Sequence, residues 1–153
     1  LRAVGEGKRV LMVQFIKGPW KSGEDEAQKN LAPFFKLVKM GRGFVGILGD
    51  TLPRTEHERA AVEALAYATK EMQSGAWDII ILDEVNNAMR LNLIAQEKVL
   101  AFVREAADKI EHLILTGRDA PQELMDRADL VTEMRDIKHP YEQGIKAKRG
   151  IEY

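Results

Sequence analysis

Two adjacent carboxylates, Asp83 and Glu84, directly follow the apolar run Ile79–Leu82. A short apolar run that ends in acids is typical of a buried parallel strand. In open α/β sheets, ligands bind at the carboxyl ends of the strands. Carboxylate oxygens at such a place suit Mg²⁺, which keeps several waters and bridges to substrate phosphates. The segment therefore predicts a magnesium site at one edge of a sheet.

The order of the two acids limits how they can bind a metal. Adjacent residues of a strand point to opposite faces, so one of them at most is a direct ligand unless the chain turns there. We expect Glu84 to lie near the metal and Asp83 to bind it directly or through water. The alternative is a helix cap or a surface acid pair. An apolar strand that ends in acids is the Walker B pattern, but the matching loop G-x-x-x-x-G-K-[ST] is absent from the 153 residues.

Two other predicted strands also end in polar residues that suit phosphate. Lys17 and Gly18 follow the first strand, and Thr116-Gly117-Arg118 follows a later one. Arginine presents a planar fork of donors that matches phosphate oxygens. Taken singly, each end has a plainer interpretation, a turn after a strand or a solvated arginine. Three such ends at one sheet edge favour a nucleotide site.

Aromatic and histidine residues leave alternatives open. Phe44 follows a glycine-rich loop and either covers a flat ligand or packs in the core, and the same choice applies to Trp20. The three histidines lack metal-ligand spacing. We expect His57 and His112 to be structural or solvated, whereas His139 either faces the site or is solvated.

The elements that must position these residues alternate between strand and helix. This alternation predicts an α/β fold, a mostly parallel sheet with helices on both faces, as a single domain over residues 1–153. Strands are predicted at Val10–Ile16, Phe34–Met40, Asp78–Leu82, His112–Leu115 and Leu130–Met134. Helices are predicted from Ser22 to Pro33, at Thr55–Ser74, along an apolar stripe from Leu93 to Ile110, and at Pro121–Ala128.

Composition excludes several classes of function. A net charge of −1 gives no basic footprint for nucleic acid, and no apolar run approaches the roughly 20 residues of a membrane span. The absence of cysteine excludes disulfides, cysteine-ligated zinc and thiol nucleophiles, and fits a cytoplasmic protein. The segment Leu1–Gly5 has the pattern of the last turn of a helix, so we expect sequence upstream of it.

Longer strings indicate a family. The chain resembles the ATP:corrinoid adenosyltransferases of the phosphate-loop type, and the order and spacing of the matching strings make coincidence improbable. The strings are Leu1–Gly5, Val13–Trp20, Gly23-Glu24, Gly41–Phe44, Ile81–Asn86, Leu115–Pro121, Ala128–Met134, Lys138–Tyr141 and Gly150–Tyr153.

The resemblance implies a RecA-like fold, a homodimer, and a strand with a phosphate loop before Leu1. Family members transfer the 5′-deoxyadenosyl group of ATP to the cobalt of a corrinoid such as cobalamin and release triphosphate. The cobalt, reduced to Co(I), is itself the nucleophile, so the resemblance also implies an electron-donating reductase. The protein then has to position the substrates and stabilise charge on the leaving group.

The resemblance also implies roles for individual residues. Glu84 and Arg118 would serve catalysis, and Glu84 with Asp83 would hold Mg²⁺. The residues implied for ATP are Lys17, Gly18, Asn86 and Arg118, and those implied for the corrinoid are Gly43, Phe44 and Trp20.

Two departures from the family pattern keep alternatives open. The phosphate loop is missing, which leaves a non-catalytic corrinoid- or nucleotide-binding relative as a second hypothesis and an unrelated NTPase as a third. Family members often carry Trp two residues after the Phe, where this chain has Gly46. Either another aromatic residue such as Trp20 substitutes for it, or cobalt reduction is less well supported.

Overall fold

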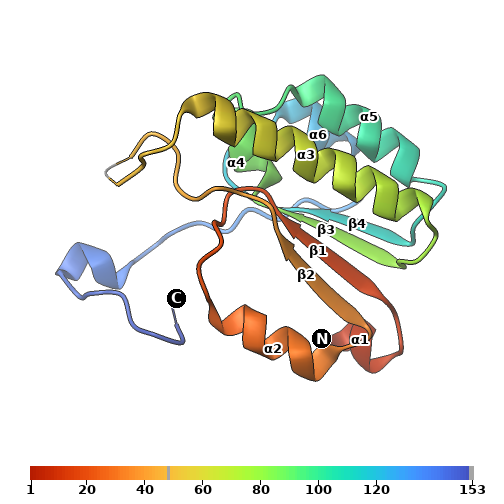
Figure 1. Cartoon of the computed structure of the whole chain (residues 1–153), viewed down its shortest axis with the longest axis horizontal. Helices are drawn as coiled ribbons and strands as arrows, with labels where there is room; N and C mark the ends of the chain where they lie inside the picture. The colour runs from red at the N-terminus through yellow and green to blue at the C-terminus, as the bar shows by residue number, and fades with distance from the viewer. Residues whose placement is uncertain (48, 152–153) are drawn as a thin grey trace.

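Four parallel strands form a sheet in the computed structural model, which describes residues 1–47 and 49–151 (Figure 1). The order across the sheet is β2-β1-β3-β4. The bounds are β1 (Val10–Gln14), β2 (Phe35–Lys39), β3 (Ile79–Asp83) and β4 (His112–Leu115). The four strands confirm the prediction of a parallel α/β fold, which is consistent with a RecA-like domain.

Helices cover both faces of this sheet, as predicted. Figure 1 shows α1 and α2 below the strands and α3, α4, α5 and α6 above them. The bounds are α1 (Arg2–Gly5), α2 (Gly23–Leu31), α3 (Arg54–Gln73), α4 (Val85–Arg90), α5 (Gln96–Ala106) and α6 (Gln122–Arg127), followed by the 3₁₀ helix η1 (Pro140–Gln143). Within the described ranges, no helix combines the length and the apolar character needed to cross a membrane.

The strand register brings the predicted polar strand ends to one edge. Gln14 pairs with Asp83, and Leu82 pairs with Leu115. Because all strands are parallel, the residues that follow β1, β3 and β4 emerge on the same side of the sheet. The loop after β2 leaves from this edge too, and in Figure 1 the C-terminal segment extends beyond it.

The core lies mainly between the sheet and the upper helices. Leu11, Val13, Ile80 and Leu82 on the central strands are fully buried. The face of α3 toward the sheet is made largely of alanine, including Ala61, Ala64 and Ala68, each fully buried. Small side chains let the helix approach the strands closely, which fixes the central strands and hence the edge where the polar residues lie.

Two predicted elements differ from the structure. Only the part of the predicted stripe from Leu93 to Ile110 that forms α5 is helical. Leu93 and Ile110 also pack on the core, but from the non-helical segments on either side of α5. The short helix α4 was not predicted. The strand predicted at Leu130–Met134 is wrong, since that segment pairs with no strand of the described chain. Leu130 and Met134 are 83% and 93% exposed, so the apolar alternation there has no partner to bury it.

Candidate active site

The chain turns sharply between the two carboxylates at the end of β3. Asp83 is the last residue of the strand, and Glu84 has a φ of 60° in the left-handed region before α4 begins. A non-glycine residue in this conformation carries strain that usually persists at functional sites. The turn removes the opposite-face restriction of a regular strand. Both carboxylates can therefore serve one site.

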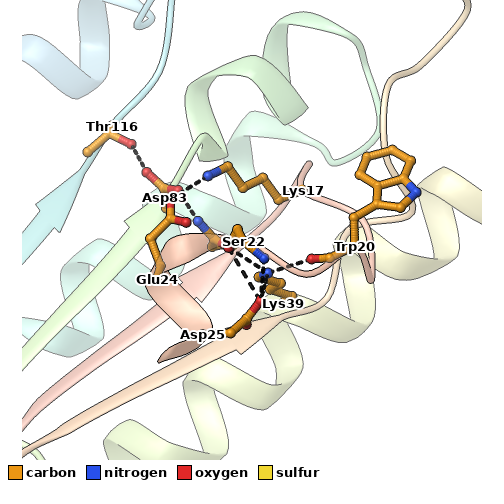
Figure 2. Close-up of polar contacts among 9 residues, drawn as sticks. Lys17, Trp20, Ser22, Glu24, Asp25, Lys39, Asp83 and Thr116 are labelled. Atoms are coloured by element: carbon orange, nitrogen blue, oxygen red, sulfur yellow. Dashed lines mark hydrogen bonds and ion pairs between the residues drawn. The ribbon is translucent and has the colours of Figure 1, made fainter. Parts of the chain in front are cut away.

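Neighbouring strands hold the Asp83 carboxylate from both sides. Figure 2 shows Thr116 donating from Oγ1 to Asp83 Oδ1 at 2.8 Å, and Gln14 Nε2 donates to Asp83 Oδ2 at 2.9 Å. Thr116 Oγ1 also accepts the backbone N–H of Glu84 at 2.9 Å. One hydroxyl therefore ties together the two acids and the end of β4.

Glu84 lies in a half-buried position whose charge balance is set by its neighbours. Burial, and then the negative charge of Asp83, raise the pKa of the Glu84 carboxyl, whereas the positive charges of Lys17 and Arg118 lower it. A cation at this site would favour the ionised form in the same way. The arrangement therefore favours binding of positive charge beside Glu84.

Asn87, which the sequence reasoning missed, bridges Glu84 and the strand end that carries Arg118. Its Oδ1 accepts the backbone N–H of Arg118 at 2.6 Å, and its Nδ2 donates to Glu84 Oε1 at 3.4 Å. The approach is close at Gly117, where φ is +125° and a Cβ would lie 2.7 Å from Asn87 Oδ1. Only glycine fits there, which explains the Thr-Gly-Arg sequence.

Arg118 and Asn86 differ in solvent exposure at this edge of the sheet. Arg118 is exposed, and no carboxylate among residues 1–47 and 49–151 forms an ion pair with its guanidinium. Its fork is therefore available to an anion. Asn86, by contrast, is only 5% exposed, and within the same ranges its Oδ1 has no hydrogen-bond partner. The structure places it behind the surface of the site rather than on it.

Lys17 and Gly18 lie at the end of β1, next to the acids. Lys17 Nζ is 2.7 Å from Glu24 Oε1 in the first turn of α2. The hydrogen bond from Lys17 is the largest of the effects that lower the pKa of Glu24 from 4.5 to about 2. Gly18 is buried, and a Cβ there would lie 3.1 Å from the Trp20 ring.

Glu24→Gln is expected to destabilise the protein slightly at neutral pH and not at all in strong acid. Because the folded-state pKa is depressed, the ion pair stabilises above pH 4.5 and the effect is lost as pH falls toward about 2. Both side chains are half exposed, so we expect only about 0.5 kcal/mol. Denaturant unfolding of both proteins across this pH range measures the difference. A constant difference would contradict the assignment.

Two aromatic rings lie together beside the strand ends. The centroids of Trp20 and Phe44 are 6.0 Å apart with planes tilted by 36°, and the residues are 58% and 62% exposed. Gly43, at φ +106°, lies directly under the indole, where a Cβ would come within 2.5 Å of the ring. Phe44 therefore has the exposed position rather than the core position left open by the sequence. The pair offers an apolar surface to a flat ligand.

The donor set fits a magnesium ion that binds together with phosphates. The available ligands are the hard oxygens of Glu84 and Asp83, and the Asp83 carboxylate is already oriented by two donors. Among the described residues, no cluster of three or more His, Cys, Asp or Glu side chains could hold a metal. Two carboxylates suffice for Mg²⁺ when waters and substrate phosphates supply the remaining ligands.

Comparison with known proteins identifies the family. The family model described as ATP:corrinoid adenosyltransferase BtuR/CobO/CobP matches residues 1–153. The chain belongs to this adenosyltransferase family. The "Corrinoid adenosyltransferase" of a Sinorhizobium species is 35% identical over 99% of this chain and 70% of its own length. The proteins of that name from Escherichia coli strain K12 and, as "Corrinoid adenosyltransferase CobA", from Salmonella typhimurium strain LT2 are 33% and 32% identical, over 99% of this chain and 74% of their own length.

Membership in the adenosyltransferase family confirms the resemblance inferred from the strings. The matched range includes residues 152–153, the end of the last string, which lie outside the described residues. The structure gives each of the three histidines a different environment. His57 is buried against Asp50 at 3.2 Å, His112 is exposed, and His139 accepts the N–H of Tyr141.

Proposed function

We propose that this protein transfers the 5′-deoxyadenosyl group of ATP to the Co(I) centre of a corrinoid and releases triphosphate. The observation that carries the proposal is the juxtaposition at one sheet edge of an acidic pair, an exposed arginine that pairs with no carboxylate of the described residues, and an exposed aromatic pair. Family membership over the whole chain adds support. The cobalt electron pair forms the bond to the 5′ carbon, and the electrons of the broken carbon–oxygen bond leave with the triphosphate.

The cationic residues of the site are proposed to stabilise the negative charge on the leaving triphosphate. We assign Arg118, Lys17 and the Gly18 backbone to the nucleotide. No carboxylate in the described part of the chain pairs with Arg118, and Lys17 lies close enough to Glu84 to lower the pKa of its carboxyl. Lys17 must exchange Glu24 for a phosphate oxygen, or share the two. Asn86 is assigned an indirect part, since its side chain is buried.

Glu84 and Asp83 are the residues proposed to hold Mg²⁺. When bound, the ion supplies Lewis acidity toward phosphate oxygens and a template for the triphosphate. Glu84 contributes the half-buried carboxylate, and Asp83, which Thr116 and Gln14 hold in place, contributes directly or through water. The same hydrogen bonds hold the Asp83 carboxylate in one orientation before the substrate arrives.

Trp20, Gly43 and Phe44 form the surface proposed for the corrinoid. Gly43 lets the indole approach the loop closely, and both rings are exposed beside the strand ends. Family members often have Trp where this chain has Gly46, and Trp20 is the aromatic residue that the structure places beside Phe44. Aromatic packing below the ring would help to remove the lower axial ligand of Co(II), which makes the cobalt easier to reduce.

Family membership supports further parts of the proposal. They are a homodimer, a reductase that supplies Co(I), a single domain for nucleotide and corrinoid, and a cytoplasmic location where ATP is abundant. The competing hypothesis of a non-catalytic binder is not favoured, since the relatives are named adenosyltransferases.

The experiment that tests the proposed function is an adenosylation assay on the intact protein. Chemically reduced cob(I)alamin is mixed with MgATP, and formation of a light-sensitive alkylcobalamin is followed by its absorption spectrum. The proposal predicts a product that depends on both protein and ATP. Corrinoid binding without any product would instead identify a binding module.

Arg118→Lys is expected to reduce kcat/KM about tenfold to a hundredfold, even though the charge is kept. A lysine ammonium cannot reproduce the bidentate contact of a guanidinium with phosphate oxygens. Arg127→Lys, on the exposed surface of α6 in an ion pair with Glu123, is the matched control and should be neutral. Steady-state kinetics with ATP as the varied substrate measure both. Equal kinetics for the two variants would remove Arg118 from the nucleotide site.

A further inference from the structure

A largely covered lysine, Lys39, joins the end of β2 to the loop that carries Trp20, and we call this contact the lysine clamp. Lys39 Nζ donates to Trp20 O at 2.8 Å, to Ser22 Oγ at 2.9 Å and to Asp25 Oδ2 at 2.6 Å, as Figure 2 shows. The Lys39 side chain is only 11% exposed. An ammonium has three donors, and all three are used here, so its charge is compensated although it is largely removed from water.

The clamp links the two segments that carry the aromatic residues of the candidate corrinoid surface. Lys39 Nζ donates to the backbone carbonyl of Trp20. Lys39 is also the last residue of β2, and the loop that follows β2 carries Phe44. A second tie joins the same two segments, because the Gly43 N–H donates to Ile16 O at 2.9 Å. The positions of both rings are thus fixed relative to the sheet through backbone contacts.

An exposed indole needs its backbone segment held by contacts such as these in order to keep one orientation. The Trp20 residue is 58% exposed, so core packing alone does not hold it. Asp25, in the first turn of α2, completes the arrangement by accepting the backbone N–H of Ser22 at 2.8 Å. The hydrogen bond from Lys39 is the largest of the effects that lower the pKa of the Asp25 carboxyl.

We propose that Lys39, with Asp25 and Ser22, is a positioning element that holds Trp20 against Gly43 and Phe44 and so shapes the corrinoid surface. Lys39 touches neither substrate. The proposal deepens the proposed function and rests on it only for the assignment of the ligand. The orientation of Trp20 is a property of the protein that can be measured without any corrinoid.

The test begins with fluorine NMR of intact protein labelled with fluorotryptophan. The Trp20 signal is assigned by its disappearance in Trp20→Phe. In Lys39→Met we expect the Trp20 signal to shift and broaden, while the signal of Trp77, which is 8% exposed, stays in place and reports intact folding. Lys29→Met is the matched control, because Lys29 forms an equally short ion pair with Glu26 at 2.6 Å on the exposed surface of α2. It should leave both signals unchanged.

Kinetics provide the second readout. We expect Lys39→Met to raise the KM for cob(I)alamin about tenfold and to change the KM for ATP less than about twofold, because misplacement of a positioning group costs rate only at the surface it shapes. Should Lys39→Met fail to fold, Ser22→Ala removes one of the three acceptors and should give a smaller change in the same direction.

The possible outcomes separate this proposal from the proposed function. An unmoved Trp20 signal in folded Lys39→Met overturns the clamp, and so does an equal rise in both KM values. If the parent protein adenosylates no corrinoid, the proposed function fails while the NMR comparison still decides whether Lys39 positions Trp20.

Discussion

Glu84→Gln is expected to lower kcat about a hundredfold to a thousandfold without unfolding the protein, a loss of several kcal/mol of transition-state stabilisation. The substitution keeps the size and shape of the side chain and removes its charge. Glu84 is the half-buried carboxylate at the left-handed turn after β3, where the positive charges of Lys17 and Arg118 interact with it. Without this carboxylate, the proposed magnesium ion would lose an anionic ligand, and the triphosphate would lose the cation that bridges it to the protein.

Initial rates as a function of Mg²⁺ concentration provide the measurement for Glu84→Gln. The expected variant shows low kcat and a raised Mg²⁺ requirement, whereas Glu97→Gln, an exposed acid in the first turn of α5, behaves as the parent. Thermal unfolding of both variants controls for stability. Full activity in Glu84→Gln would show that metal and triphosphate are held elsewhere.

Phe44→Ala is expected to reduce kcat/KM for the corrinoid about tenfold to a hundredfold and to leave nucleotide affinity unchanged. The ring is 62% exposed, so its loss should change the free energy of unfolding by less than about 0.5 kcal/mol. In the proposed function the Phe44 ring contacts the flat corrinoid, and an aromatic side chain buries roughly 150–250 Å² when covered. Phe44→Ala removes one of the two rings of the Trp20–Phe44 pair.

Parallel titrations of cob(II)alamin and ATP measure the effect of Phe44→Ala. The spectrum of bound cob(II)alamin should also show less four-coordinate cobalt in the variant than in the parent. Phe34→Ala is the matched control, because Phe34 is 38% exposed and precedes β2 at the opposite edge of the sheet. Equal corrinoid affinity in both variants would place the corrinoid away from Phe44.

The central parts of the site were predictable because they depend on strand direction. An apolar run followed by two acids, and polar residues after two further strands, have to meet at one edge once the sheet is parallel, and the register of Gln14 with Asp83 confirms this. The turn between the two acids is not visible in the sequence. The φ of 60° at Glu84 turns the chain and lifts the restriction that a regular strand imposes, so that Asp83 and Glu84 can serve one edge.

Residues that act through long-range contacts were not predictable. Thr116 and Gln14 hold Asp83, and Lys39 holds the Trp20 loop, but these partners are separated by 19 to 69 residues in the chain. Nothing local marks a strand lysine as a clamp rather than a solvated charge. The strand predicted at Leu130–Met134 was wrong for the opposite reason, because local alternation has meaning only where a neighbouring strand pairs with it.

The most direct test of the account is the identity of the phosphorus product. Intact protein is incubated with MgATP and cob(I)alamin, and phosphorus NMR of the mixture is compared with the amount of alkylcobalamin formed. Attack of cobalt at the 5′ carbon predicts inorganic triphosphate in a one-to-one ratio with the corrinoid product. ADP and inorganic phosphate in its place would show cleavage at the γ-phosphate and would contradict adenosyl transfer.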